Sequence, residues 1–207
     1  MAEDTRLKTV LMFGGPGTGK GTQGEILAGI PGFFHSSTGD VFRSLDRGSE
    51  VGKIFTEYSS RGELVPDDVT IRIWLQNIQA HMALSHYKPA RDLLILDGLP
   101  RTVAQAKLLE EHVDVLKIVY LMASDEQAMV DRLRKRALKS GRADDADENV
   151  IRNRWQVYAA ETSPVLDYYP AEKVAEVDAI GTLGQVLCKV LGVVVPVQDA
   201  NFPPFGS

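Results

Sequence analysis

The segment GGPGTGKGTQ, residues 14–23, has the residue types of a loop that binds phosphate groups, and it follows the apolar run TVLMF. The general phosphate-loop pattern is glycine, four residues, glycine, lysine, and then serine or threonine. Here Gly21 occupies the serine or threonine position, and Thr22 follows one residue later. Glycine-rich backbone can surround an anion with N–H groups, a helix N-terminus adds partial positive charge, and Lys20 adds a full charge. The segment therefore predicts a phosphate site.

Two further groups could act on phosphates or on a metal ion. Between residues 132 and 154 lie eight of the 23 lysines and arginines of the chain. Arg132 and Arg136 are four residues apart, so both can face the same side of one helix. A solvent-exposed helix with salt bridges remains the alternative. Asp97 ends the apolar run LLIL, which places it at the carboxyl edge of a predicted sheet, where a carboxylate could orient Mg²⁺ or cap the following turn.

The elements that must position these residues alternate between strand and helix. The apolar runs KTVLMF, DLLILD and VLKIVYLM lack clean alternation, which is typical of parallel strands buried on both faces, and each precedes a helical pattern. FFHS at 33–36 and KVAEVD at 173–178 are weaker strand candidates. These patterns predict an α/β fold with a five-stranded parallel sheet flanked by helices. The helix LGQVLCKVL closes the fold, and we expect Cys188 within it to be a core residue.

Composition restricts the class of protein. The 207 residues carry a formal net charge of −5, which argues against a general nucleic-acid binder. No apolar stretch approaches the roughly 20 residues that span a bilayer, and the polar start MAEDTRLK does not resemble a signal peptide, so we predict a cytoplasmic protein. A single cysteine allows neither an internal disulfide nor a cysteine zinc site. The four histidines lack a partner pattern, and we expect them to be structural or surface residues.

Five motifs together indicate a family. GGPGTGKGTQ, HSSTGDVFR, GELVPDD, LILDGLPRTVAQA and GRADD occur in an order and at spacings that resemble the nucleoside monophosphate kinases, most closely adenylate kinases of the short-lid type, over about residues 8–185. In that family the loop lysine is followed by Gly and then Thr. The resemblance implies one P-loop kinase domain over residues 1–207, with a core of 8–36, 81–134 and 155–195. It also implies an NMP-binding helical insertion of about 37–66, extended by helix to 80, and a short lid of about 135–147. The C-terminal tail is 193–207.

The resemblance also implies two nucleotide sites and the residues that form them. For ATP these are Gly17, Thr18, Gly19, Lys20, Gly21, Thr22, Arg136 and Gly181. For AMP they are Thr38, Gly39, Arg43, Glu63, Leu64, Val65, Gly98, Arg101, Gln105, Arg142 and Arg154. The catalytic set is Lys20, Arg101, Arg132, Arg136, Arg142 and Arg154. Asp97 and Thr22 would act on Mg²⁺ largely through water, and no zinc is implied.

The implied reaction is reversible, Mg²⁺-dependent phosphoryl transfer from ATP to AMP, which gives two ADP and maintains the balance of adenine nucleotides. Thr38 and Gln105 favour AMP as acceptor, because a glutamine amide can pair with the adenine edge as donor and acceptor. UMP/CMP kinase is the alternative enzyme, and a nucleotide-binding scaffold without turnover is a further alternative. Leu99 departs from the aromatic residue usual in the family. The expected partners are ATP, AMP and ADP, with neither nucleic acid nor membrane, and we expect a monomer.

Overall fold

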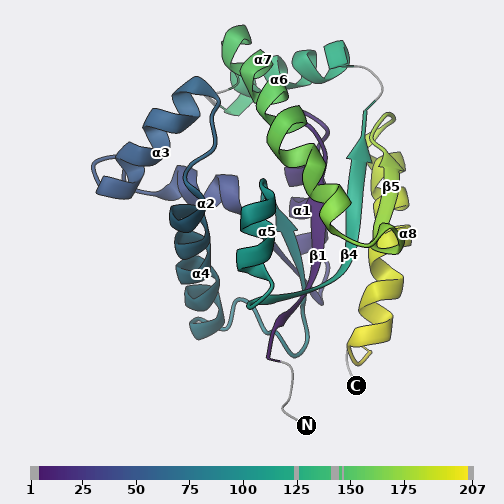
Figure 1. Ribbon diagram of the computed structural model, residues 1–207. Helices are drawn as coiled ribbons and strands as arrows, with labels where there is room; N and C mark the ends of the chain where they lie inside the picture. Colours follow the sequence, from purple (N-terminus) through teal and green to yellow (C-terminus); the bar gives the residue numbers. More distant parts are fainter. Residues whose placement is uncertain (1–4, 124–125, 141–144, 146, 205–207) are drawn as a thin grey trace.

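Five parallel strands form the centre of the computed structural model, which describes residues 5–123, 126–140, 145 and 147–204. The predicted α/β fold is confirmed (Figure 1). The strands are β1 Leu7–Phe13, β2 Phe33–Ser37, β3 Leu93–Asp97, β4 Val113–Met122 and β5 Val174–Asp178, in the order β2-β3-β1-β4-β5. Because β1 has β3 on one side and β4 on the other, the strand order reverses next to β1, and ligands of open α/β sheets bind at such a point.

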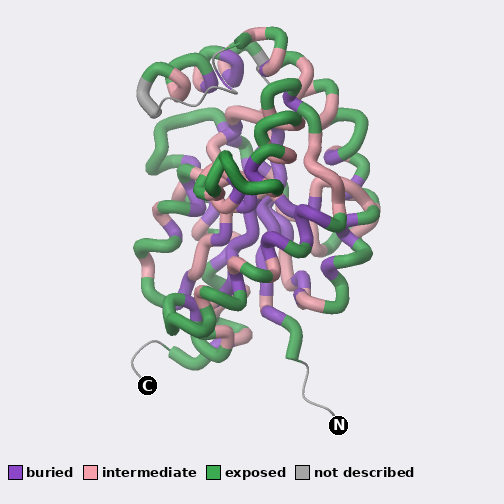
Figure 2. Tube along the Cα trace, turned by 90° about the vertical axis from the view of Figure 1, so that its left-hand side faces the viewer, coloured by how far each residue is buried: buried purple, intermediate pink, exposed green. Residues whose placement is uncertain are grey.

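Helices cover both faces of the sheet, which explains why the central strands read as continuous apolar runs. On one face, Leu27 of α1 Lys20–Ala28 and Val190 of α8 Leu183–Asn201 pack with Val10 of β1. On the other face, Trp74 of α4 Asp67–Ala83 and Leu109 of α5 Val103–Leu109 pack with strand residues such as Leu96. Figure 2 shows the buried residues gathered along the middle of the molecule, between these two layers.

Helices of the predicted NMP-binding insertion, and helices on both sides of the predicted lid loop, lie at the carboxyl edge of the sheet (Figure 1). The NMP-binding insertion contains α2 Thr38–Ser44, α3 Glu50–Arg61 and the start of α4. Phe42, Val69 and Ile73 form a separate small core beneath them. We call this insertion the acceptor arm, residues 38–70. Helices α6 Glu126–Ser140 and α7 Glu148–Val157 precede and follow the loop of the predicted short lid, about 135–147, of which residues 141–144 and 146 lie outside the described residues. Leu133, Ile151 and their apolar neighbours make the contact between these two helices.

The segment after α7 departs from regular helix geometry. A π-helical turn, Tyr158–Thr162, follows α7 directly and leads into the 3₁₀ helices Ser163–Tyr168 and Ala171–Lys173. Turns of the π type occur frequently at functional sites. Here the turn lies beside the phosphate loop, as the site geometry below describes.

The C-terminal helix corrects two sequence expectations. Helix α8 continues through Pro196 to Asn201, and among the described residues it is the one helix long and apolar enough to cross a membrane by length and composition alone. Its residues Val186, Val190 and Val194 are nevertheless buried against the sheet, as in a helix that packs one side on a sheet. We infer that this apolar packing outweighs the roughly 3 kcal/mol cost of a proline within a helix. Cys188 is exposed rather than buried, because it lies on the opposite side of α8 from these valines.

Candidate active site

The turn between β1 and α1 is the first part of the site. Residues 14–19 connect Phe13, at the carboxyl end of β1, to Lys20, the first residue of α1. Gly19 is the N-cap of α1 and has a φ of 97°, a left-handed conformation that favours glycine. The first N–H groups of a helix have no partners within the helix, so this turn presents N–H groups and partial positive charge to an anion.

The ammonium group of Lys20 folds back over this turn. Its Nζ donates hydrogen bonds to the carbonyl oxygens of Gly14, at 2.6 Å, and Gly15, at 3.1 Å. Burial lowers the pKa of Lys20 from 10.5 to about 8; the Asp97 carboxylate opposes this shift, and nearby arginines add to it. Lys20 is therefore mostly charged at neutral pH and releases its proton more readily than an exposed lysine would.

Asp97 lies at the same edge of the sheet, because β1 and β3 are neighbours and Met12 pairs with Asp97. Its carboxylate is buried, and Oδ2 is 3.9 Å from Nε2 of His35, which is beyond hydrogen-bonding distance. Burial alone would raise the pKa of Asp97, but His35, Lys20 and Arg101 outweigh burial and hold that pKa below its usual value. The carboxylate is therefore ionised and can attract a cation.

A buried carboxylate joins two of the predicted arginines. Asp145 is fully buried; its Oδ2 accepts from Nε of Arg136 and its Oδ1 accepts from Nη1 of Arg154, both at 2.6 Å. Burial alone would raise the pKa of Asp145, but the two guanidinium groups lower it. Asp145 thus brings Arg136 of α6 and Arg154 of α7 together, although they are 18 residues apart in the sequence.

The other predicted arginines lie in different places. Arg132 donates from Nη1 to the carbonyl oxygen of Ala179 at 3.2 Å, so it contacts the loop before α8. Arg43 pairs with Asp40 one helical turn earlier. Arg101 donates from Nε to the carbonyl oxygen of Gly98 at 2.9 Å. Arg142 lies outside the described residues.

One cavity lies between the acceptor arm, the end of β3 and α7. Its lining contains every described residue of the predicted AMP set: Thr38, Gly39, Arg43, Glu63, Leu64, Val65, Gly98, Arg101, Gln105 and Arg154. Phe42 and Phe55 line it as well, with stacked rings whose centroids are 5.3 Å apart. We call it the acceptor cavity. Its apolar wall and polar floor suit a flat heterocycle attached to an anionic group.

A second cavity lies across the phosphate loop, between α1, α6 and the start of α8. Six residues of the predicted ATP set line it: Gly17, Thr18, Gly19, Thr22, Arg136 and Gly181. Arg132 lines it too, so Arg132 and Arg136 do face one cavity. Lys20 and Gly21 line a third cavity, which also contains Asp97, Arg43, Arg101 and Arg154. The third cavity connects the phosphate loop with the residues that border the acceptor cavity.

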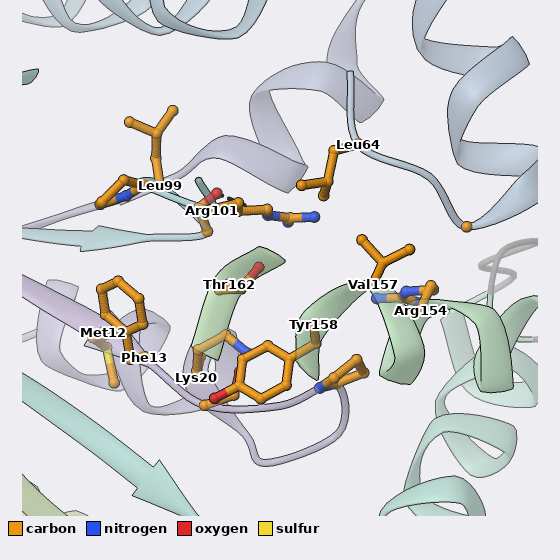
Figure 3. A pocket seen from close by; sticks show the side chains of 15 residues that line it. Met12, Phe13, Lys20, Leu64, Leu99, Arg101, Arg154, Val157, Tyr158 and Thr162 are labelled. Carbon is orange, nitrogen blue, oxygen red and sulfur yellow. Dashed lines mark hydrogen bonds between the residues drawn. The ribbon is translucent and has the colours of Figure 1, made fainter. Parts of the chain in front are cut away.

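A fourth pocket shows how the loop, the arm and α7 meet. Figure 3 shows Arg101 and Arg154 entering it from opposite sides, with Lys20 and Tyr158 on the side of the phosphate loop. Leu99 is 2% exposed and contributes an aliphatic wall near Arg101. Cations from three separate parts of the fold therefore converge on one volume, as a reaction between two phosphate groups would require.

The acceptor arm contacts α7 through its backbone. Nδ2 of Asn153 donates to the carbonyl oxygen of Arg61 at 2.6 Å. Gly62 ends α3 with a φ of 72°, and a Cβ built on it would lie 2.9 Å from the carbonyl oxygen of Val150. Only glycine fits this approach without displacement of the arm, so Gly62 is part of the surface that closes the acceptor cavity.

Comparison with known proteins decides the family. The family model for adenylate kinase matches residues 12–174. The chain belongs to the adenylate kinase family. An adenylate kinase of Flavobacterium psychrophilum is 39% identical over 184 residues, which cover 86% of this chain and 93% of the relative. The adenylate kinase of Flavobacterium johnsoniae is 36% identical over 191 residues, which cover 89% of this chain and 97% of the relative. That of Corynebacterium urealyticum is 36% identical over 178 residues, which cover 86% of this chain and 93% of the relative.

As a member of the adenylate kinase family, the chain is a nucleoside monophosphate kinase, a phosphotransferase. The predicted membership of the adenylate kinase family, the fold class and the enzyme class are thereby confirmed. The motif order that suggested the family also accounts for the phosphate-loop ending, in which Gly21 and Thr22 follow the lysine.

The donor atoms near the loop fit the Mg²⁺ that adenylate kinases generally need. Asp97 supplies one ionised carboxylate, and Thr22 supplies a hydroxyl in the same cavity. No group of three or more His, Cys, Asp or Glu within the described part of the chain could hold a metal ion. Mg²⁺ often retains several waters and binds through one or two carboxylates together with phosphates, so this sparse donor set suits an ion that arrives with a nucleotide.

Several residues at the site were missed by sequence reasoning. The sequence pattern assigns no role to Asp145, which is fully buried between two arginines. His35, expected to be a structural or surface residue, has a buried side chain that lies beside Asp97, a position that the sequence does not indicate. Phe42 and Phe55 resemble ordinary core residues of an amphipathic insertion, and no sequence signal assigns them to a cavity. The GRADD motif could have drawn attention to Asp145, since it supplies a carboxylate amid the basic cluster.

Proposed function

We propose that this protein catalyses reversible, Mg²⁺-dependent transfer of the γ-phosphoryl group of ATP to AMP, producing two ADP and maintaining the balance of adenine nucleotides. The observation that carries the proposal is the acceptor cavity, where Gln105 and Thr38 border one part and Arg43 and Arg101 border another, next to the phosphate loop. The base of AMP lies toward Gln105, and its phosphate lies toward the arginines.

Catalysis depends on position and charge rather than on a general base. The second pKa of a phosphate monoester is about 6, so the acceptor is already mostly a dianion at neutral pH and can attack without losing a proton. Lys20 contacts the donor phosphates, Arg43 and Arg101 hold the acceptor phosphate, and Arg136 and Arg154 offset the charge of the transferring group. These cations replace the solvation that the phosphates lose when water is excluded.

Mg²⁺ would be held near Asp97 and Thr22, mostly through its own water molecules, and supplies charge neutralisation to the donor phosphates when bound. Asp97 contributes an ionised carboxylate whose place is fixed by β3. Lys20 borders the same cavity and would contact the same phosphates directly.

The paired arginines suggest how the lid takes part. Asp145 holds Arg136 and Arg154 side by side, so their guanidinium groups are oriented before any phosphate arrives. Preorganised cations cost little reorganisation during the reaction. Arg132 contacts the donor side through the loop before α8, and Arg142 would complete the lid.

We further propose that the protein acts as a cytoplasmic monomer, organised as a core, an NMP-binding arm of about residues 37–66 extended to 80, and a short lid of about 135–147. The division is supported by the separate small core under α2, α3 and α4. The single cysteine cannot form an internal disulfide, which suits a reducing compartment.

A coupled assay with ATP and each of AMP, UMP, CMP and GMP tests the proposal. We expect rapid ADP formation with AMP, and kcat/KM lower by at least about a hundredfold with the others, because Gln105 complements the adenine edge. Preference for UMP or CMP would instead indicate a UMP/CMP kinase. A folded protein that binds ATP but turns over none of the four would be a scaffold without activity.

A further inference from the structure

The amide of Gln105 is held from both ends. Its Nε2 donates to Oδ1 of Asp67 at 2.8 Å, and its Oε1 accepts from the backbone N–H of Arg101 at 2.7 Å. The residue is 1% exposed, so water cannot substitute freely for either partner. The side chain that faces the acceptor base therefore has a defined orientation before any nucleotide binds.

The chemistry of the two partners fixes which end of the amide is nitrogen. A backbone N–H can only donate, and an ionised carboxylate can only accept. If the amide turned by 180°, its NH₂ would face the N–H of Arg101, and its oxygen would face the carboxylate of Asp67. Both contacts would become repulsive in a buried place, where an unsatisfied polar group is costly. Asp67 and the N–H of Arg101 thus select one of two orientations.

Asp67 is itself fixed by a second contact. It lies in the first turn of α4, and its Oδ2 accepts from the hydroxyl of Thr102 at 3.0 Å. Thr102 is the N-cap of α5, and its Oγ1 accepts from the backbone N–H of Gln105. One carboxylate therefore connects the start of α4 in the acceptor arm with the cap of α5 and the Gln105 amide.

The selected orientation has a consequence for the base. Each end of the Gln105 amide keeps one hydrogen-bonding position: an N–H on Nε2 and a lone pair on Oε1. Adenine presents an N6 donor beside an N1 acceptor, and the fixed amide can satisfy both. A 6-oxopurine such as hypoxanthine or guanine presents an O6 acceptor beside an N1–H donor, which requires the opposite orientation.

We propose that Asp67 is a positioning residue that holds the Gln105 amide in the orientation that accepts AMP and rejects 6-oxopurine monophosphates. The proposal rests on the proposed use of AMP as acceptor and adds the physical basis of its discrimination. Asp67 is not among the residues that line the acceptor cavity, so it acts on the base only through Gln105.

The test is Asp67→Asn, measured as kcat/KM for AMP and for IMP at saturating ATP. An asparagine keeps the volume of the side chain and can turn either its oxygen or its NH₂ toward Gln105. Position 67 then no longer favours one orientation of the glutamine, and the backbone N–H of Arg101 acts without that second contact. We expect the AMP-to-IMP ratio to fall by about tenfold or more, mainly through improved use of IMP, as expected for the loss of a hydrogen bond to a charged group. The KM for ATP should not change.

Asp68→Asn is the matched control, because Asp68 lies in the same helical turn but is exposed. It should keep the wild-type ratio. Asp67→Ala removes the carboxylate that accepts from Gln105 but leaves the contact of Gln105 with Arg101. It should also lower the AMP-to-IMP ratio, and it serves as the test if Asp67→Asn does not fold.

The proposal is overturned if a folded Asp67→Asn or Asp67→Ala protein keeps the wild-type ratio, or loses AMP and IMP use in equal proportion, as a merely structural role would produce. The proposed function fails differently: the wild-type protein would then show no preference for AMP at all, whatever the variants did.

Discussion

Lys20 is the residue on which the phosphate loop depends most directly. Its buried ammonium group lies against the loop carbonyls and beside Asp97. Replacement by methionine keeps the length of the chain and the glycine backbone but removes the charge. We expect Lys20→Met to lower kcat by about a hundredfold or more, because one preorganised electrostatic contact is lost. Steady-state kinetics with ATP and AMP measures this effect.

Lys107→Met is a suitable control, since Lys107 is exposed on α5, outside the cavities described above. Its kcat should equal that of the wild type. Full activity in a Lys20→Met protein with a native circular dichroism spectrum would show that the loop is not the donor-phosphate site.

The lowered pKa of Lys20 makes a separate prediction about pH. The pKa of this group is about 8 in the free protein, so its positive charge is present below that pH and is lost above it. The kcat/KM for ATP reports the free enzyme, and we expect it to fall as pH rises through about 8. Bound phosphates favour the charged ammonium, so kcat should persist to higher pH. A Lys20→Arg variant should lose this step, because a guanidinium group does not titrate in the range.

The titration of Lys20 should affect the free energy of unfolding in the opposite direction to activity as pH rises. In the unfolded chain Lys20 has its ordinary pKa of 10.5, so between about 8 and 10.5 the unfolded state binds more protons than the folded state. The contribution of Lys20 to the free energy of unfolding therefore rises with pH across this window. Loss of activity above pH 8 would thus not come from unfolding caused by Lys20, and a melting curve at each pH checks the point.

At the scale of secondary-structure elements, the junction between α3 and α7 borders the acceptor cavity, which Gly62 and Arg154 line. Gly62→Ala places a methyl group 2.9 Å from the carbonyl oxygen of Val150 and in a left-handed backbone conformation that costs about 1–2 kcal/mol. We expect a lower melting temperature and a higher KM for AMP, with little change in the KM for ATP. Calorimetry and steady-state kinetics measure both effects.

Gly192→Ala gives the contrasting result for the same substitution. Gly192 lies within α8, with open space around it, so alanine should be neutral or stabilising by about 0.5–1 kcal/mol. If Gly62→Ala behaved like Gly192→Ala in both stability and KM for AMP, the contact between α3 and α7 would have no part in acceptor binding.

The strands and helices differ in how well the sequence predicts them. The runs around Val10 and Leu94 are buried on both faces, so their lack of alternation indicated parallel strands correctly. The extent of α8 was not predictable, because Pro196 signals a helix end locally while tertiary packing of its valines continues the helix. Likewise, Gln105 and Asp97 were identified by their motifs, but the contacts of Asp145 and Asp67 depend on which helices meet in space.

At the scale of the whole molecule, the residues of the site come from several separate elements of the fold. Arg43 lies on the acceptor arm, Arg154 on α7, and Lys20 and Asp97 on the edge of the sheet, yet all four border one cavity. An open arm would admit water to the γ-phosphoryl group and waste ATP by hydrolysis. We therefore expect nucleotide binding to stabilise the closed arrangement of both insertions.

An analogue that joins two adenosines through five phosphates tests this closure. It should bind much more tightly than ATP or AMP alone, because one molecule fills both cavities. Hydrogen exchange should slow in α3 and in α6 and α7, as well as in the phosphate loop. Protection confined to residues 14–22, with both insertions as labile as in the free protein, would contradict closure.

We expect the phosphoryl group to pass directly between two nucleotides bound in adjacent cavities. The most direct measurement follows the label of γ-³²P-ATP in a single turnover with excess enzyme and AMP. Direct transfer should place the label in the β-phosphate of ADP formed from AMP and form two ADP for each ATP consumed, and no label should be released when AMP is left out. Label released as inorganic phosphate, at a rate independent of AMP, would contradict it.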